Sequence, residues 1–276
     1  MKTFYILSAL AFCILVFHSC GKVEYSPHQK FDSNTPQQLN EKNIKWLQSK
    51  VNNDTLRFVL SGDSQREYED SEEMVNIINR IRGVDFVLLN GDISDFGLYQ
   101  EMEWMNDIFS KLNVPYITVL GNHDLYSGSG KAIYNRMYGP ENFSFVYDSI
   151  KFVCHDANSR EYNFNGKVPD IPWLANELQP QEGVKGYIGA SHVPPYDVDF
   201  DRNLEQEYTS LLVNSPNFIA SLHAHINKTQ ISTPYGGNIP FIVTKNVKGE
   251  EFILIDIIDG KISFQAVPFD ADPADY

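Results

Sequence analysis

Asn122, His123 and Asp124 stand side by side, shortly after an apolar, β-rich run at residues 114–119. An amide, an imidazole and a carboxylate in one tight turn can ligate a metal, move a proton and accept hydrogen bonds. The apolar run is typical of a buried strand, and open α/β sheets carry their chemistry just past the carboxyl ends of their strands. Alone, this turn is weak evidence, because Gly-Asn and His-Asp pairs also form ordinary turns.

Polar side chains of the same kind follow four more predicted strands. They are Asp63 and Gln65 after residues 56–60, Asp92 after 85–89, His192 after 186–190, and His223 and His225 after 218–222. Neighbouring strands bring their carboxyl ends to one edge of a sheet, so we expect these side chains to lie together. Carboxylates, amides and imidazoles in this number can hold two borderline-hard divalent cations. Two ions roughly 4 Å apart clamp a phosphoryl group and activate a water.

Each of these residues also has an ordinary structural interpretation. Asp63 and Asp92 could form turns and cap the following helices, and His192 could be a loop histidine. On a continuous strand, His223 and His225 would face the same side, where two charged imidazoles would repel each other. A bound metal explains that spacing more easily. The recurrence of polar residues at five strand ends therefore favours a metal site.

The order of these motifs resembles the calcineurin-like metallophosphoesterase superfamily. The shared pattern is Asp-x-Gln at 63–65, Gly-Asp-x-x-Asp at 91–95, Gly-Asn-His-Asp at 121–124, a lone His192, and His-x-His at 223–225. The pattern extends over most of the chain, roughly from residue 56 to residue 269. The resemblance implies an α/β (α+β) fold, a four-layer sandwich of two mixed β-sheets flanked by helices, as in metallo-dependent phosphatases.

The resemblance also implies a role for each residue of the pattern. One metal would be held by Asp63, Gln65 and His225, and the other by Asn122, His192 and His223, with Asp92 bridging the two. His123 would contact the phosphoryl group or the leaving oxygen as a cation or general acid, oriented by Asp124 or Asp95. The implied reaction is hydrolysis of a phosphoester or phosphoanhydride by a metal-bridging hydroxide. Phosphomonoesterase, phosphodiesterase and pyrophosphatase activities all fit.

Three residues depart from the usual pattern of this superfamily. Gln65 stands where many members have His, and its neutral amide oxygen favours manganese, iron or magnesium over zinc, with manganese and iron preferred. Asp-x-Gln resembles a branch that includes manganese-dependent ADP-ribose pyrophosphatases. Leu222 replaces the Gly usual before His-x-His. Phe96 stands where the serine/threonine protein phosphatases carry Arg, which argues against that branch.

Four further residues are candidates for contacts with the substrate, and each fits a solvated loop equally well. They are Arg66, Asn158, Arg160 and Tyr196. His155 is expected in the core or just behind the metal ligands. The expected substrate is a small phosphorylated compound: a nucleotide derivative, a sugar phosphate or a lipid-linked phosphate.

Helical spacing of apolar residues alternates with the predicted strands along the chain. It predicts helices near residues 41–51, 71–82, 98–112, 131–138 and 203–213, with Ser71 as an N-cap, and hairpins from residue 230 to residue 269. This alternation predicts one domain of mixed β and βαβ units, spanning residues 41–276.

The first residues do not belong to that domain. A basic start and a short apolar run predict a signal peptide over residues 1–19. Ser19-Cys20 resembles the lipobox of bacterial lipoproteins, which implies a lipidated Cys20, and the polar residues 20–40 then read as a tether. The chain is thus expected outside the cytoplasm, anchored to a membrane in the periplasm or at the cell surface. An ordinary secretory signal or an N-terminal anchor helix is the alternative.

Charge and cysteine content exclude several other functions. Removal of residues 1–19 takes away Lys2 and no acid, so the net charge changes from −14 to 21 − 36 = −15. An acidic surface repels phosphate backbones, which makes long nucleic acid a poor candidate substrate. Cys154 would be the one free thiol of the mature chain, so we expect neither a disulfide framework nor a cysteine-based zinc site.

Two classes of function fit these observations. The leading hypothesis is a metal-dependent phosphoric ester hydrolase. The alternative is a non-catalytic module that keeps the fold and binds metal or phosphate. Gln65 and Leu222 support the alternative, whereas the intact His123 argues against it.

Overall fold

The structure is a computed structural model that describes residues 31, 35–50 and 55–276. The predicted signal peptide and Cys20 lie outside the described residues. Within the described part of the chain, every helix is too short or too polar to cross a membrane.

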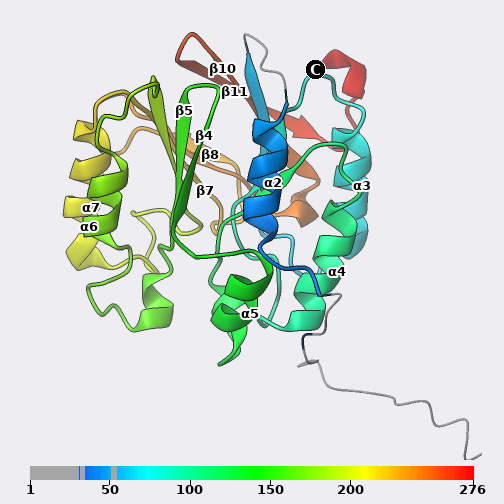
Figure 1. The fold of residues 1–276 in the computed structure, drawn as a ribbon, viewed down its shortest axis with the longest axis horizontal. Coiled ribbons are helices and arrows are strands. Elements are labelled where there is room, and N and C mark those ends of the chain that lie inside the picture. The colour runs from blue at the N-terminus through cyan, green and yellow to red at the C-terminus, as the bar shows by residue number, and fades with distance from the viewer. Residues whose placement is uncertain (1–30, 32–34, 51–54) are drawn as a thin grey trace, which may run out of the picture.

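Two mixed sheets form the centre of the molecule (Figure 1). Sheet A has the order β11-β10-β1-β2-β3 and is built from β1 (Leu56–Ser61), β2 (Phe86–Leu89), β3 (Tyr116–Thr118), β10 (Glu251–Ile258) and β11 (Lys261–Pro268). Sheet B has the order β4-β5-β6-β7-β9-β8 and is built from β4 (Phe143–Tyr147), β5 (Ile150–Cys154), β6 (Gly186–Ala190), β7 (Phe218–His223), β8 (Gln230–Ser232) and β9 (Phe241–Val243). Strands β1 to β3 are mutually parallel, and so are β5, β6, β7 and β9.

Helices cover the outer face of each sheet (Figure 1). Those packed on sheet A are α3 (Tyr68–Ile78), α4 (Tyr99–Phe109) and α5 (Gly130–Met137), and those packed on sheet B are α6 (Ile171–Glu177) and α7 (Arg202–Asn214). The predicted four-layer sandwich of two mixed sheets flanked by helices is therefore confirmed. Helix α3 begins three residues earlier than predicted, so Ser71 is buried inside the helix and does not cap it.

Aromatic residues fill the core between the two sheets. Phe58 of β1 stacks on Phe86 of β2, with ring centroids 5.0 Å apart. Phe152 of β5 meets both rings edge to face at 5.4 and 5.3 Å. Leu222 packs in the same core, so the side chain that replaces the usual Gly contributes to inter-sheet packing. These contacts fix the position of one sheet relative to the other.

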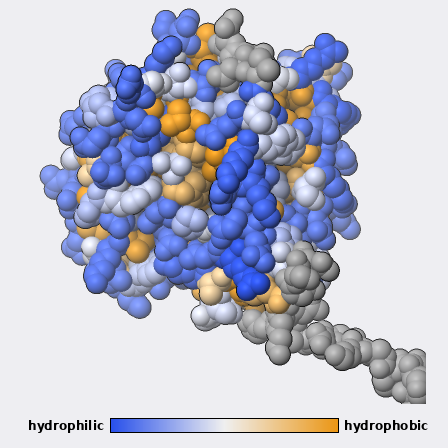
Figure 2. All heavy atoms as spheres, viewed as in Figure 1, coloured by the Kyte–Doolittle hydropathy of each residue, from blue (hydrophilic) through white to orange (hydrophobic). Residues whose placement is uncertain are grey.

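Helix α2 (Leu39–Gln48) covers the side of the sandwich where the edge strands β3 and β4 leave backbone groups unpaired. The Asn40 amide acts like a strand residue: its Nδ2 donates to Thr118 O, and Thr118 N donates to its Oδ1, both at 2.9 Å. Gln48 donates to Val146 O of β4 at 2.9 Å. The outer face of α2 is hydrophilic (Figure 2). The predicted tether over residues 20–40 therefore ends in a residue, Asn40, that packs against the domain.

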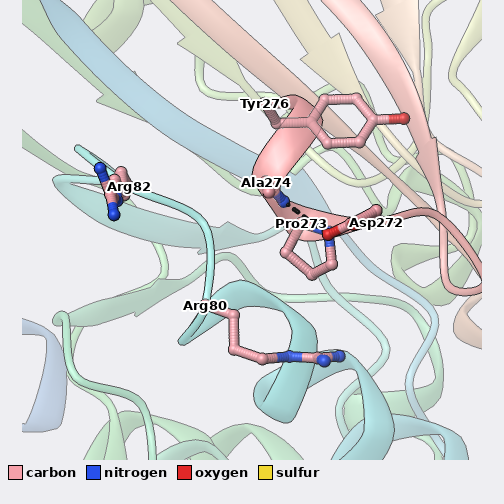
Figure 3. Close-up of a pocket in the computed structure, with 6 residues that line it drawn as sticks. All are labelled: Arg80, Arg82, Asp272, Pro273, Ala274 and Tyr276. Carbon is pink, nitrogen blue, oxygen red and sulfur yellow. Dashed lines mark hydrogen bonds between the residues drawn. The ribbon is translucent and has the colours of Figure 1, made fainter.

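The C-terminal part of the chain completes sheet A. Strands β10 and β11 form the predicted hairpin through Asp259 and Gly260, which have φ angles of 50° and 73°. A pocket lies between the end of α3 and the last residues of the chain (Figure 3). It is lined by Arg80, Arg82, Asp272, Pro273, Ala274 and Tyr276, none of which belongs to the predicted site.

Candidate metal centre

The carboxyl ends of β1, β2, β3, β6 and β7 meet where the two sheets adjoin, and the predicted ligands follow these strands. Asn90, just past β2, connects the sheets: its Nδ2 donates to Ser191 O at 2.9 Å and to Leu222 O at 2.8 Å. Asp63, Asp92 and His225 adopt left-handed backbone conformations, with φ of 50°, 54° and 71°. Such conformations are uncommon for residues with side chains and are typical of functional loops.

Two glycines allow these loops to approach one another closely. A Cβ atom on Gly91 would lie 2.6 Å from His192 Nδ1. A Cβ atom on Gly121 would overlap the backbone nitrogen of Asp92. Any side chain at these positions would therefore push apart the strand ends that carry the predicted ligands.

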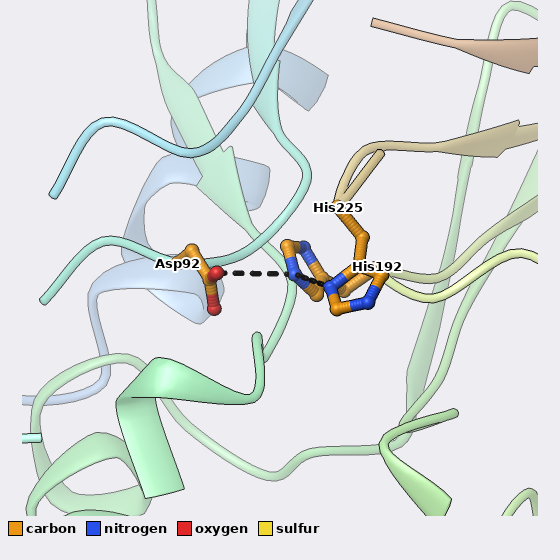
Figure 4. Close-up of side chains that lie close together, drawn as sticks. All are labelled: Asp92, His192 and His225. Carbon is orange, nitrogen blue, oxygen red and sulfur yellow. Dashed lines mark hydrogen bonds and ion pairs between the residues drawn. The ribbon is translucent and has the colours of Figure 1, made fainter. Parts of the chain in front are cut away.

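Asp92, His192 and His225 form a group of converging side chains (Figure 4). Nε2 of His192 lies 3.2 Å from Asp92 Oδ2 and 3.3 Å from His225 Nδ1. Asn122 Oδ1 lies 3.1 Å from the same Nε2 and 3.0 Å from His225 Nδ1. One carboxylate, one amide oxygen and two imidazoles thus meet around a single point.

The tautomer of His192 indicates that a cation is needed where these side chains converge. Its Nδ1 donates to the Asn90 carbonyl oxygen at 2.7 Å, and a carbonyl can only accept. In the neutral ring, Nε2 would therefore present a lone pair to the oxygens of Asp92 and Asn122. This arrangement is favourable only when a proton or a metal cation occupies the space between them. The donor set fits a divalent cation.

The charges in the group show the same preference for a cation. Burial lowers the pKa of His192, but the Asp92 and Asp63 carboxylates and the Asn90 carbonyl together outweigh it and raise the pKa to about 10. Burial raises the pKa of Asp63 to about 7, although His192 opposes this effect. Burial also raises the pKa of Asp92, but His192 and His123 together lower it by more, so the net pKa lies below its usual value. Buried carboxylates of this kind need positive charge nearby.

The remaining members of the first predicted metal site lie at the edge of this group. Asp63 Oδ2 accepts a hydrogen bond from the backbone nitrogen of His225 at 3.0 Å, and its Oδ1 lies 3.9 Å from His192 Nε2. Gln65 Nε2 lies 3.5 Å from Asp92 Oδ2. The Gln65 Oε1 atom is buried without a hydrogen-bond partner, and a bound cation would satisfy it.

The structure does not bring His223 into the converging group. Its Nδ1 lies 3.1 Å from Ser191 O, and its Nε2 lies 2.8 Å from Ser221 Oγ. Its ring is fully buried and stacks on Phe241, with centroids 5.7 Å apart. Both nitrogens therefore have partners, one in β7 and the other just past β6. Burial lowers the pKa of His223 to about 3, so the ring is neutral at physiological pH.

His123 lies beside the group on η1 (His123–Leu125). Its backbone nitrogen donates to Asp92 Oδ1 at 2.9 Å, and its Nδ1 lies 3.0 Å from Asp95 O and 3.6 Å from Asp95 Oδ1. Asp124, the other residue expected to orient the imidazole, is fully buried and accepts four hydrogen bonds elsewhere. They come from Ile93 N, Ser94 N, Ser94 Oγ and Gly121 N, at 2.8–3.0 Å. Asp95 thus contacts His123, whereas Asp124 holds the two loops together.

A family model for calcineurin-like phosphoesterases matches residues 56–228, more than half of the 276-residue chain. The chain belongs to this family. No curated protein matches it in sequence. Family membership supports a metal-dependent phosphoesterase in general and implies divalent metal ions, and the converging group supplies candidate ligands for them.

Solved structures share the fold at low sequence identity. A dimetal phosphatase from Danio rerio is 13% identical, with a TM-score of 0.65 over 78% of this chain and 96% of that chain. The purple acid phosphatase PPD1 from yellow lupin (Lupinus luteus) is 11% identical, with a TM-score of 0.64 over 79% and 52%. GAP50, the anchor in the inner membrane complex of Plasmodium, is 14% identical, with a TM-score of 0.61 over 78% and 85%.

Two carboxylates that we did not predict adjoin the site of this calcineurin-like phosphoesterase. Asp197 and Asp199, in the loop after β6, lie 3.6 and 3.3 Å from His225 Nε2. Metal-binding imidazoles commonly donate their second nitrogen to a carboxylate, which fixes the ring. The Asp-x-Asp spacing shortly after His192 was the only sequence signal, and such spacing is common in surface loops.

The candidate substrate residues have different surroundings. Arg66 and Arg160 are more than half exposed and pair with Asp95 at 2.5 Å and Asp199 at 2.8 Å. Asn158 is fully buried, and its Nδ2 donates to Leu120 O at 3.1 Å, so it supports the loop after β3. Tyr196 is partly buried, and its hydroxyl lies 3.4 Å from Gln230 Nε2. The two arginines are therefore the ones placed to meet an anionic substrate.

His155 lies in the helix-covered layer of sheet B. It is fully buried, and its Nε2 lies 2.9 Å from the hydroxyl of Tyr208 on α7. Its contacts are those of a core histidine, one of the two placements expected for it.

Proposed function

We propose that this chain hydrolyses phosphoester or phosphoanhydride bonds in small molecules with the help of divalent metal ions. One observation carries the proposal. His192 Nε2 faces the oxygens of Asp92 and Asn122 while its Nδ1 is committed to a backbone carbonyl. In a phosphoesterase, a cation at this point would keep these side chains together and would also take part in the reaction.

Six residues would hold the ions. They are Asp63, Gln65, Asp92, Asn122, His192 and His225. When bound, divalent ions supply Lewis acidity, which neutralises phosphoryl oxygens and lowers the pKa of water. The amide oxygens of Gln65 and Asn122 favour manganese or iron over zinc. We propose two ions per chain, and the Asp92 carboxylate would help to hold both.

The protein's own residues supply orientation and a proton. With Nδ1 of His123 held by Asp95, Nε2 is the nitrogen free to contact a phosphoryl or leaving oxygen. A proton donated there neutralises the charge that develops as the ester bond breaks. Arg66 and Arg160 at the rim attract an anionic substrate. Asp124 keeps the loops after β2 and β3 in register, which fixes the imidazole relative to Asp92.

Metal-dependent turnover tests the proposal. The full mature chain is stripped with chelator, reconstituted with manganese, iron, zinc or magnesium, and assayed with bis-(4-nitrophenyl) phosphate and 4-nitrophenyl phosphate. We expect turnover of at least one ester in the manganese or iron form and none after chelation. Turnover that persists with chelator, or its absence in every metal form, would contradict the proposal.

A non-catalytic binding module is the second candidate, and the position of His223 favours it. The expected ligand is bonded to Ser191 and Ser221 instead, which leaves the second metal site one imidazole short. The Plasmodium anchor GAP50 shares this fold. A chain that binds metal but turns over neither ester would support the module and contradict hydrolysis.

We further propose that the mature chain is a lipoprotein anchored through Cys20 outside the cytoplasm. The apolar run followed by Ser19-Cys20 supports this location. Mass spectrometry of the mature N-terminus should show a diacylglyceryl-modified Cys20, and Cys20→Ala should release the chain from the membrane fraction. An unmodified N-terminus at another residue would contradict the anchor.

A further inference from the structure

Two exposed aromatic rings lie beside His123. Phe96 and Tyr126 are 48% and 62% exposed. The Tyr126 ring lies 26° from parallel to the His123 ring, with centroids 5.5 Å apart. Phe96 meets Tyr126 edge to face at 6.3 Å. Isolated exposed aromatics are common, but these rings are continuous with the imidazole proposed to act on the leaving oxygen.

The loops that carry the two rings are fastened to each other. Ser127 N donates to Phe96 O and Ser127 Oγ donates to Gly97 O, both at 3.0 Å. Gly97 has a φ of 66°, and a Cβ atom there would overlap the carbonyl oxygen of Asp124. The rings therefore stand on one preorganised unit, so a ligand that binds them has little loop motion to arrest.

A cation lies on one of these rings, and a second exposed cation belongs to the same candidate site. The Arg66 guanidinium lies over the Phe96 ring, 5.8 Å from its centroid. A second exposed cation, Arg160, pairs with Asp199, which itself lies 3.3 Å from His225 Nε2. A ligand that bears both a planar ring and negative charge matches this surface better than a neutral or purely aliphatic one.

We propose that Phe96 and Tyr126, the aromatic platform, bind a planar aromatic base in the leaving part of the substrate, so that the enzyme acts on nucleotides. This inference rests on the proposed function and narrows its substrate class. His123 occupies one side of the Tyr126 ring, and the exposed ring surface remains open for stacking. Stacking on an aromatic side chain tolerates any base, because every base has a π face. Sugar phosphates and lipid-linked phosphates lack such a ring.

Two measurements on the full chain test the platform. The first is saturation-transfer NMR on the chelator-treated chain, with adenosine as probe and ribose as the base-free control, because no turnover occurs there. The second is the ratio of kcat/KM for AMP to that for ribose 5-phosphate in the manganese form. The variants are Tyr126→Leu, the conservative Tyr126→Phe, and Trp104→Leu. Trp104 is a matched control, 49% exposed on α4 and packed against Tyr68.

We expect adenosine to bind and ribose not to bind detectably. Tyr126→Leu should weaken adenosine binding about tenfold and lower the kinetic preference for AMP by a similar factor. Tyr126→Phe and Trp104→Leu should leave adenosine binding and the preference for AMP within about twofold of the unchanged chain.

The proposed platform is contradicted if the unchanged chain does not bind adenosine, or if Tyr126→Leu binds it equally well. Adenosine binding without hydrolysis of any ester would keep the platform and reject the proposed function. Hydrolysis without adenosine binding would do the reverse.

Discussion

His223 and His225 are separated by one residue, yet their imidazoles have different environments. His223 ends β7, is fully buried, and bonds to Ser221 of β7 and to Ser191 just past β6. His225 lies past the strand, faces Asn122 and His192 through Nδ1, and faces Asp199 through Nε2. One ring belongs to the helix-covered layer and the other to the candidate metal centre.

The difference follows from where the strand ends. Residues two apart on a strand share a face, so His223 lies beside Ser221. The alternation stops at His223, and His225 has a left-handed φ of 71°. The expectation that the two imidazoles face the same side of the strand is therefore wrong for this pair. We infer that substitutions at the candidate metal centre should abolish activity and leave the fold intact. Substitutions on the helix-covered side should lower the stability of the fold and leave the chemistry intact.

Asp92→Asn should have the largest effect. The substitution removes the charge that faces His192 and the expected bridge between the ions, so kcat should fall by at least about 1000-fold and both metals should be lost. Circular dichroism should show an intact fold. An Asn variant that stays active and retains its metals would show that the reaction does not depend on Asp92. It would also contradict the difference in role between the candidate metal centre and the helix-covered side.

His123→Ala separates proton transfer from metal binding within the centre. It should retain the metals and lower kcat by about 100- to 1000-fold, because general acid catalysis contributes effects of that size. Metal content by mass spectrometry and steady-state kinetics check the two halves of the prediction. Loss of metal in this variant would mean that His123 is itself a ligand.

The matched pair His225→Ala and His223→Ala tests whether the two imidazoles have different roles. His225→Ala should weaken metal affinity by about 100-fold or more. His223→Ala should change metal affinity less than about threefold and lower the free energy of unfolding by roughly 2–4 kcal/mol, since it empties a buried site stacked on Phe241. Calorimetric metal titration and urea unfolding measure both. Equal losses of metal affinity would return His223 to the ligand set.

His155 gives the smallest effect, a pH dependence of stability on the helix-covered side. Burial lowers its pKa from 6.5 to about 4 in the folded chain. Below pH 6.5 the unfolded chain gains a proton that the folded chain does not take up, so stability falls as the pH decreases from 6.5 towards 4. The loss at pH 5 is roughly 2 kcal/mol.

His155→Gln removes this contribution. Urea unfolding of both chains at pH 7.5 and pH 5 isolates it, because the other titrating groups are common to the two. The variant should lose less stability between these pH values than the unchanged chain. Identical losses would show that His155 does not titrate on unfolding.

Apolar periodicity predicted most of the fold, because burial on one face imposes it on strands and helices alike. The strands around residues 186–190 and 218–222 and the hairpin formed by β10 and β11 appear as expected. The ends of helices were less predictable. Ser71 is a good N-cap by residue type, but α3 begins three residues before it, at Tyr68. The packing of Asn40 against β3 could not be foreseen, because an amide that completes an edge strand has no sequence signature.

Strand ends identified the site, and loop geometry refined it. The positions of Asp92, Asn122, His192 and His225 follow from parallel strands that meet at one edge. The Asp95 carbonyl contact to His123, the inward turn of Asp124 and the approach of Asp199 to His225 depend on loop backbone angles that residue types do not specify. The exposure of Tyr126 likewise depends on how its loop folds.

The most direct test of the account is metal content of the purified mature chain, equilibrated with manganese, desalted and analysed by mass spectrometry beside Asp92→Asn. We predict about two ions per chain for the unchanged protein and close to none for the variant. A chain that retains no metal, or a variant that retains as much as the unchanged protein, would contradict the claim that these converging side chains form a metal centre.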